Sequence, residues 1–238
     1  MLIKNLKKLT LAALVISFMI PAGVSSANVE SVTRIAGKDR IGTSIEISKA
    51  MFNESDNVVL ASGFNFADAL SAGQLAAALN APLILSDENM DLRVKEKIAN
   101  LKPKNMYIVG GENALGSNIE ESVKSAVNDI NIERLKGNNR YETSVKVMEK
   151  TKEFVDAEYL LIASGKNFPD ALSATSFMAD HKALMVLSDG NSYPKSDLKE
   201  IAIGGVNQLP LNGFTGERIA GKDRYQTSLA LAKKSFEN

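Results

Sequence analysis

The sequence repeats itself, and this constrains the fold more than any other feature. An arginine-containing block that leads into a Thr-Ser pair occurs three times, starting at Arg34, Arg134 and Arg218. Three further blocks occur twice in the same order, starting at residues 61 and 163, 81 and 183, and 108 and 202. Four ordered blocks do not recur by chance, so the chain contains a duplicated unit. The copies are longer than the roughly 20–50 residues of a solenoid repeat, which predicts that they pack as separate modules.

Short β-branched segments alternate with helical segments inside each copy. Buried strands bounded by turn residues are expected at 58–61, 83–86, 106–109, 159–163, 184–188 and 201–203. Helices are expected between them at 68–79, 92–101, 117–127 and 170–179. This alternation predicts βαβ units with right-handed crossovers and a mainly parallel sheet, and therefore an α/β fold in each copy.

The spacing of the repeats divides the chain. The second arginine of the block recurs after 100 residues and then after 84, and the shortfall is expected mainly after Gly205, where a helix has been trimmed. We therefore predict a first module at 28–131 and a shortened second module at 132–215. Residues 216–238 are either a truncated third module or the last strand and helix of the second.

The N-terminal segment reads as a secretory signal peptide. Three lysines and no acidic residue precede residue 9, an apolar run extends to Ile20, and small residues end at Ala27. The apolar run is shorter than the about 20 residues that cross a bilayer, which argues against a membrane anchor. Cleavage after Ala27 would leave a chain with a formal net charge of −3 and no cysteine, secreted without disulfides and without a membrane segment.

The arginine-containing block predicts the start of a helix. A good N-cap residue precedes the second arginine of every copy, namely Asp39, Asn139 and Asp223. Glu142 and Gln226 stand where a capping box needs them, and an apolar stripe at helical spacing follows. The block also carries glycines that suit a left-handed turn, Gly37, Gly137 and Gly221.

The second arginine of each block, Arg40, Arg140 or Arg224, is then the first residue of a helix. A cation there opposes the helix dipole, so a specific negative group should meet it. One alternative is an internal ion pair with Asp68 or Asp170. The other is an external phosphate or carboxylate on a polymer, bound by the arginine forks. Six of the seven arginines lie at repeat positions, so arginine has a specialised role here.

The residue inventory excludes several kinds of chemistry. There is no cysteine and one histidine, His181, so no Cys-rich metal site, thiolate nucleophile or paired-histidine site is expected. Basic and acidic residues balance at 28 each, which gives no argument for a nucleic-acid partner. Asp87 and Asp189 follow buried strands, but no second acid recurs beside them. We therefore expect no catalytic residue, metal or cofactor.

The repeated blocks resemble the cell wall-binding repeat 2 family of Gram-positive surface proteins. The resemblance covers about residues 32–238 and is carried by four motifs. These are Arg-Ile-Ala-Gly-Lys-Asp-Arg at 34–40 and 218–224, Ala-Ser-Gly-x-Asn-Phe-x-Asp-Ala-Leu-Ser-Ala at 61–72 and 163–174, Ala-Pro-Leu-Ile-Leu-Ser-Asp at 81–87, and Val-Gly-Gly at 109–111. It implies Toprim-like, flavodoxin-like α/β modules: two near-complete copies and a truncated third, where the family usually has three in a pseudo-threefold arrangement.

The resemblance also implies a function. Family modules attach surface-layer proteins, adhesins and wall hydrolases non-covalently to an anionic wall polymer such as a teichoic acid, and an apolar triplet corresponding to Leu83, Ile84 and Leu85 is tied to that attachment. The candidate polymer contacts are Arg34, Arg40, Arg134, Arg140, Arg218, Arg224, Leu83, Ile84 and Leu85. We thus predict a secreted, non-catalytic protein of the cell wall or cell surface, with self-association as one way to rebuild three-way packing. The alternative is a wall hydrolase or an accessory of an N-acetylmuramoyl-L-alanine amidase.

Overall fold

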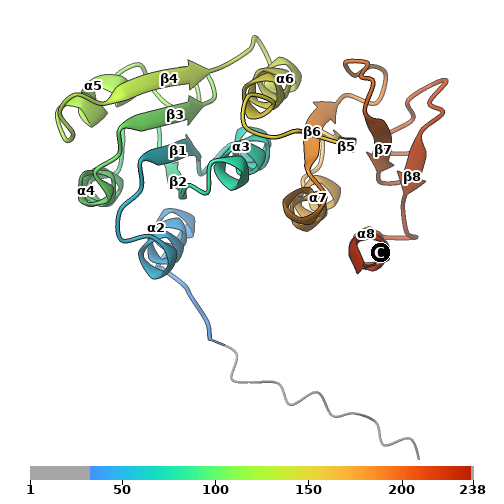
Figure 1. Ribbon diagram of the computed structural model, residues 1–238, viewed down its shortest axis with the longest axis horizontal. Coiled ribbons are helices and arrows are strands. Elements are labelled where there is room, and N and C mark those ends of the chain that lie inside the picture. The colour runs from blue at the N-terminus through green and yellow to red at the C-terminus, as the bar shows by residue number, and fades with distance from the viewer. Residues whose placement is uncertain (1–32, 237–238) are drawn as a thin grey trace, which may run out of the picture. The chain divides into compact units, whose positions relative to one another are not determined.

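Each copy of the repeat contains a parallel sheet of four strands, as Figure 1 shows for the computed structural model. The structure describes residues 33–236, so the expected signal peptide at 1–27 lies outside the described residues. The strand order is β2-β1-β3-β4 in the first sheet and β6-β5-β7-β8 in the second. The expected α/β fold with parallel sheets is confirmed.

The first copy contributes four helices and four strands in alternation. In chain order these are α2 (Arg40–Met51), β1 (Asn57–Ser62), α3 (Phe66–Ala78), β2 (Leu83–Ser86), α4 (Leu92–Leu101), β3 (Asn105–Val109), α5 (Ile119–Lys124) and β4 (Asn131–Leu135). The central strands β1 and β3 are almost entirely buried, which explains why their sequences are continuously apolar instead of alternating.

The second copy repeats this order with fewer helices. It contains α6 (Arg140–Thr151), β5 (Tyr159–Ser164), α7 (Pro169–Asp180), β6 (Ala183–Ser188), β7 (Lys199–Ile203), β8 (Glu217–Ile219) and α8 (Arg224–Phe236). Within the described residues it lacks counterparts of both α4 and α5, whereas the sequence predicted one loss, after Gly205. The segment between β6 and β7 is a loop, because it is too short to cross over with a helix.

The last strand of each sheet carries an arginine of the repeated block. Asn131–Leu135 pairs with β3, and Glu217–Ile219 pairs with β7, both in parallel. Strand β4 was not predicted, because it carries Glu133 and Arg134 and is only partly buried. A last strand within 216–238 was one of the two predicted alternatives, and β8 is that strand. Residues 217–219 therefore complete the sheet of the second copy, and α8 packs against α7.

Helix α6 belongs to the packing of both copies. It contacts α3 of the first copy and β6 of the second, and Figure 1 shows it beside both elements. Val147 lies in an apolar cluster formed otherwise by the first copy, and Met148 lies in a cluster of the second. Among the described residues no helix has the length and apolar character needed to span a membrane.

The side chain of Gln74 also joins the two copies. Its amide nitrogen donates to the carbonyl of Met185 at 2.9 Å, and its amide oxygen accepts from the Met185 N–H at 2.9 Å. Met185 lies on β6, an edge strand, so the glutamine side chain pairs with this edge as a neighbouring strand would. Both groups are buried, so these two hydrogen bonds fix α3 against the second sheet.

Candidate functional site

The repeated block forms the start of a helix in all three places, as predicted. Helices α2, α6 and α8 begin at Arg40, Arg140 and Arg224. The preceding side chains cap them: Asp39 accepts from Gly42 N–H at 2.6 Å, and Asp223 accepts from Gln226 N–H at 2.9 Å. Asn139 accepts from two N–H groups of α6. The free N–H groups of these helices are thus partly satisfied within the motif.

The glycines of the block serve close packing, and the prediction of a left-handed turn at these positions is wrong. None of the three is among the glycines with positive φ. A Cβ atom on Gly37 would lie 2.2 Å from the Gly42 carbonyl carbon, and one on Gly137 would lie 2.2 Å from the Glu142 Cβ. The Gly221 position is equally tight. The chain before each helix therefore crosses its first turn at a distance that only glycine allows.

The Thr-Ser pair secures the motif and joins it to the sheet. Thr43 Oγ1 accepts from the N–H of Gly37 at 3.1 Å, and the later copies repeat this bond. Ser44 Oγ accepts from the Leu85 N–H on the edge strand β2 at 3.0 Å, and Ser144 does the same for Leu187 on β6 at 2.9 Å. Ser228 on α8, the third copy of this serine, is exposed.

Two of the candidate arginines have internal partners. Arg134 has a side chain only 9% exposed, forms a two-point contact with Glu120 at 2.6 and 2.7 Å, and donates to three backbone carbonyls. Arg218 donates to the carbonyls of Gly204 and Leu209, with no carboxylate partner because the helix that carries Glu120 has no counterpart there. Burial lowers the pKa of Arg218. These guanidinium groups hold the loop after the third strand of each sheet.

The arginines that begin helices have much weaker internal contacts. Arg40 and Arg140 each donate one N–H to a carbonyl at 2.8 Å, that of Gly63 and of Gly165 respectively. Each guanidinium also lies 5.3 Å from a phenylalanine ring centre. Arg224 and Arg34 are exposed. A guanidinium has five N–H donors, so most of the donor capacity of Arg40 and Arg140 remains available.

The predicted internal carboxylates lie near these arginines without pairing with them. Among residues 33–236, no ion pair within 4.0 Å joins Asp68 to Arg140 or Asp170 to Arg224, although each arginine lowers the pKa of its neighbour. Burial acts in the opposite direction and dominates, so it raises the pKa of Asp68 to about 6. The Asp68 carboxylate, 4% exposed as a residue, accepts one hydrogen bond, from the Asn65 amide at 2.8 Å.

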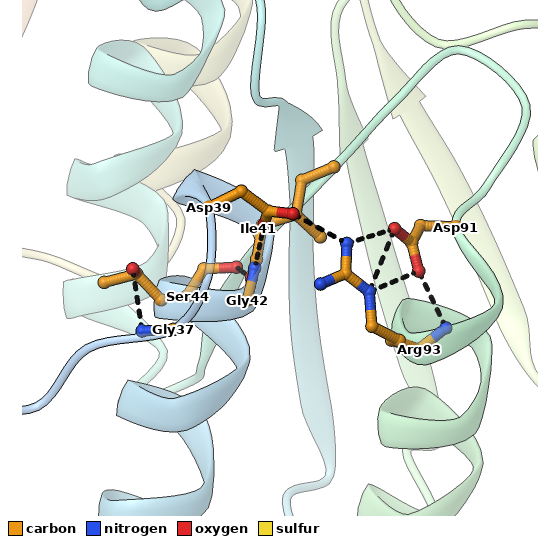
Figure 2. Close-up of polar contacts among 8 residues, drawn as sticks. Gly37, Asp39, Ile41, Gly42, Ser44, Asp91 and Arg93 are labelled. Atoms are coloured by element: carbon orange, nitrogen blue, oxygen red, sulfur yellow. Dashed lines mark hydrogen bonds and ion pairs between the residues drawn. The ribbon is translucent and has the colours of Figure 1, made fainter.

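Sequence reasoning missed one functional contact of the motif, made by the arginine outside the repeats. Arg93 donates to both Asp91 and Asp39, at 3.1 Å from Asp39 Oδ2, and so connects the start of α4 to the start of α2 (Figure 2). The two carboxylates raise the pKa of Arg93, and the arginine lowers the pKa of both. The cap of α2 is therefore internally neutralised, a feature that the second copy lacks because it has no α4.

The apolar triplet lies on the edge strand β2. Ile84 is fully buried, whereas Leu83 and Leu85 are partly exposed and line a cavity of about 820 Å³. Exposed apolar side chains of α2, Ile47 and Met51, line the same cavity. In the second copy the corresponding triplet on β6 is buried, because α3 and its Gln74 cover that edge.

A second, polar cavity opens at the carboxyl ends of the strands. It has a volume of about 550 Å³ and lies where α3, the loop after β3 and the start of α6 meet. Its lining includes Asn65, Asp68, Asn113, Arg140 and Glu142. Among the described residues no group of three or more His, Asp and Glu side chains is arranged to hold a metal ion.

A model of known protein families matches most of the described chain. The match is to cell wall binding domain 2 (CWB2), over residues 34–120 and 134–212, one region for each sheet. The chain belongs to the CWB2 family. The two matched regions begin at the first arginine of the repeated block in each copy, as the sequence resemblance implied.

Curated relatives of this CWB2 chain come from cell wall enzymology. It is 28% identical to the N-acetylmuramoyl-L-alanine amidase LytC of Bacillus subtilis, over 96% of this chain and 47% of the amidase. It is also 28% identical to the amidase enhancer of the same organism, over 89% of this chain and 30% of that protein. The CWB2 chain thus spans about half or less of the length of these relatives, and the sequence similarity is confined to that shared portion.

Two solved structures share the fold. Cwp6 from Clostridium difficile superposes with a TM-score of 0.78 at 26% identity, covering 90% of this chain and 38% of that one. Cwp8 from the same organism superposes with a TM-score of 0.74 at 23% identity, covering 84% and 37%. The paired CWB2 sheets seen here therefore correspond to a part of each of those larger proteins.

Proposed function

We propose that this protein is secreted, stays at the cell wall or cell surface and binds an anionic wall polymer non-covalently, without catalysing a reaction. The polymer contacts in this proposal are Arg40, Arg140 and Arg224, together with the exposed Arg34. Arg134 and Arg218 hold the loops beside them, and Leu83, Ile84 and Leu85 form the apolar edge strand next to Arg40. The chemistry suits a phosphate-rich glycopolymer of the teichoic acid type, or a surface-layer glycopolymer with carboxylates.

The observation that carries the proposal is the repeated arginine at the first position of α2, α6 and α8. This arginine occurs three times in the same local structure, and the helix dipole disfavours a cation at that position. Arg40 and Arg140 each form one described internal hydrogen bond. A residue that costs stability and keeps its donors free is suited to an outside ligand. Arginine also matches the two-point geometry of phosphate and carboxylate groups.

The affinity in this proposal comes from repetition. One exposed ion pair contributes about 0–1 kcal/mol, so a single arginine would hold the polymer poorly. Three arginines on one chain facing many anionic groups on one polymer turn the later contacts into intramolecular events. Binding should therefore weaken steeply as salt concentration rises.

Sedimentation with purified cell wall tests the proposal. We expect the mature chain to sediment with wall at about 50 mM NaCl. It should be released towards about 500 mM NaCl, because the electrostatic screening length falls to a few ångströms. The triple variant R40A/R140A/R224A should lose wall affinity by about 10–100-fold. The triple variant K124A/K152A/K233A is the matched control, because it removes the same number of positive charges from exposed lysines outside the repeated block. Equal sedimentation with wall stripped of anionic polymer would overturn the proposal.

The non-catalytic part of the proposal has its own test. The relatives include an amidase and an amidase enhancer, so hydrolysis of wall is the competing activity. We expect no clearing when the mature chain is run on a gel containing purified wall. A clearing band from the purified protein would contradict this part while leaving wall binding intact.

We also infer that the chain self-associates, with residues 216–238 acting as the start of a third module. Tyr225 and Leu229 on α8 are 79% and 57% exposed, whereas their counterparts on α6, Tyr141 and Val145, pack against the second copy. Helix α2 shows the converse: it covers β2 but has no α3-type helix beside it, which leaves the apolar cavity open. A second copy would meet these needs if α8 of one chain lay at the α2–β2 end of the other. In that arrangement α8 would take the position beside β2 that α2 occupies in its own chain.

Light scattering at increasing protein concentration tests this inference. Association should strengthen with concentration and be lost in the double variant Y225E/L229E. A monomer at all concentrations would refute self-association without affecting the proposal of wall binding.

A further inference from the structure

The inference concerns the polar cavity at the carboxyl ends of the first sheet, and it rests on the proposed wall binding. In the order β2-β1-β3-β4, the chain leaves β1 towards one side of the sheet and leaves β3 towards the other. Parallel sheets of this kind bind ligands at such a switch point, outside the carboxyl ends of the strands. The cavity of about 550 Å³ lies there, and its volume falls within the about 300–1,000 Å³ of small-molecule sites.

The most buried charged group in the lining of this cavity is the Asp68 carboxylate. It is almost fully buried, and its one hydrogen bond in the described structure comes from Asn65. A carboxylate accepts about four hydrogen bonds, so most of its capacity is unused. The backbone makes room for it, because a Cβ on Gly110 would lie 2.8 Å from Asp68 Oδ2 and Gly110 has a φ of +118°.

Part of this arrangement recurs in the second copy, where Asp170 is less buried. A Cβ on Gly204 would lie 2.6 Å from Asp170 Oδ2, and Gly204 has a φ of +109°. Arg224 stands to Asp170 as Arg140 stands to Asp68, close enough to lower its pKa. Both copies therefore contain a carboxylate, a nearby arginine, and a glycine whose missing side chain leaves room for the carboxylate.

A second carboxylate, beside the cavity, has an oxygen without a hydrogen-bond partner in the described structure. Asp87 Oδ1 is buried and has no hydrogen-bond partner in the described structure. Asp87 lines a smaller cavity of about 480 Å³ that shares Asn65 and Asn113 with the first. A buried oxygen without a donor is costly, so its donor is expected to come from a ligand.

These groups define the chemistry of the ligand. The buried Asp68 carboxylate calls for hydrogen-bond donors from a ligand, and Arg140 beside it offers donors to the same ligand. No aromatic side chain lines the larger cavity, which disfavours a nucleobase. Adjacent hydroxyls of a sugar ring both donate and accept at this spacing. We propose that the cavity containing Asp68 and Arg140 is a saccharide subsite that binds hydroxyl-bearing sugar units of the wall polymer, and that the corresponding residues Asp170 and Arg224 bind a further sugar unit.

The substitution D68N distinguishes a sugar subsite from binding that depends on net charge alone. Removing a negative charge should strengthen binding to an anionic polymer wherever only net charge matters. A sugar subsite predicts the reverse, since the amide replaces an ionic acceptor with a weaker one. We expect D68N to weaken sedimentation with purified wall about tenfold, and D68N/D170N to weaken it further. D56N is the matched control, because Asp56 precedes β1 at the opposite end of the strands and carries the same charge.

Competition identifies the ligand class. A mixture of glucose and N-acetylglucosamine should displace the wild-type chain from wall at millimolar concentration and should displace D68N less, whereas inorganic phosphate, which competes for the arginines of the proposed function, should displace both chains alike. Wild-type affinity in D68N, or no displacement of the wild-type chain by the sugars, would overturn the saccharide subsites while wall binding stands. Failure of the wild-type chain to bind wall at all would instead overturn the proposed function, so the two failures are distinguishable.

Discussion

Ionisation of Asp68 should destabilise the fold, and D68N should remove that cost. Burial raises the pKa of this carboxyl from 3.8 to about 6, even though Arg140 acts in the opposite direction. Each pKa unit corresponds to about 1.4 kcal/mol, so the folded state at neutral pH carries a penalty of about 3 kcal/mol relative to the protonated side chain. The Asn side chain is uncharged and still accepts the hydrogen bond from Asn65.

The sign of the pH dependence follows from the direction of the shift. Below pH 3.8 the carboxyl is protonated in the folded and the unfolded chain, so there is no penalty. Between pH 3.8 and about 6 the folded chain binds the proton and the unfolded chain does not, so stability falls as pH rises. Above pH 6 the full penalty is present. The stability advantage of D68N over wild type should therefore grow from near zero at pH 4 to about 3 kcal/mol at pH 7.

Urea unfolding of both proteins across this pH range measures the difference. At pH 7 the advantage should also appear as a melting temperature about 6–12 °C higher, since 1 kcal/mol shifts a chain of this size by about 2–4 °C. D170N should show the same sign with a smaller amplitude, because Asp170 is less buried. A difference between D68N and wild type that stays constant from pH 4 to pH 7 would refute the reasoning.

Four further substitutions test the packing of the copies by urea unfolding. Q74L should cost about 2–4 kcal/mol, because it leaves the buried backbone groups of Met185 without partners, and a loss below 1 kcal/mol would contradict the role given to this side chain. R134M should cost about 3–5 kcal/mol by leaving Glu120 unpaired, while E120Q should cost less because the amide still accepts. G137A should cost about 1–3 kcal/mol, since its new methyl group would collide with the first turn of α6, and an unchanged midpoint would refute the close-packing explanation.

The sequence predicted the modules well because their strands are short, apolar and bounded by turns. Leu83–Ser86 and Leu92–Leu101 were predicted with the bounds that the structure gives them. The start of α6 at Arg140 followed from capping chemistry alone. Local signals were sufficient for these elements because turn and capping residues mark where one element ends and the next begins.

Tertiary contacts account for what was missed. Strand β4 carries a buried arginine, which is unusual in a strand until Glu120 and the loop carbonyls around it are seen. Gly137 reads as a turn glycine because its distance to α6 is invisible in the sequence. The contact of Arg93 with Asp39 joins residues 54 positions apart, and no local pattern indicates it.

The candidate site was predicted in part. The sequence singled out the repeat arginines, but it could not separate Arg134, which is buried against Glu120, from Arg140, which keeps most of its donors. It placed Asp68 at the start of a helix, which is correct, and gave it as one of two alternative partners of a repeat arginine. Its burial beneath a polar cavity depends on the approach of Gly110, a residue on another strand end.

Helix α6 packs in both copies, and this couples the unfolding of the two sheets. Val147 and Met148 are neighbours on one helix, yet each completes a different apolar cluster. Melting either sheet strips a buried side chain from the other, so the two halves should denature in a single cooperative transition despite their separate hydrogen-bonded sheets. Heating should therefore give one unfolding transition that every spectroscopic probe reports at the same midpoint.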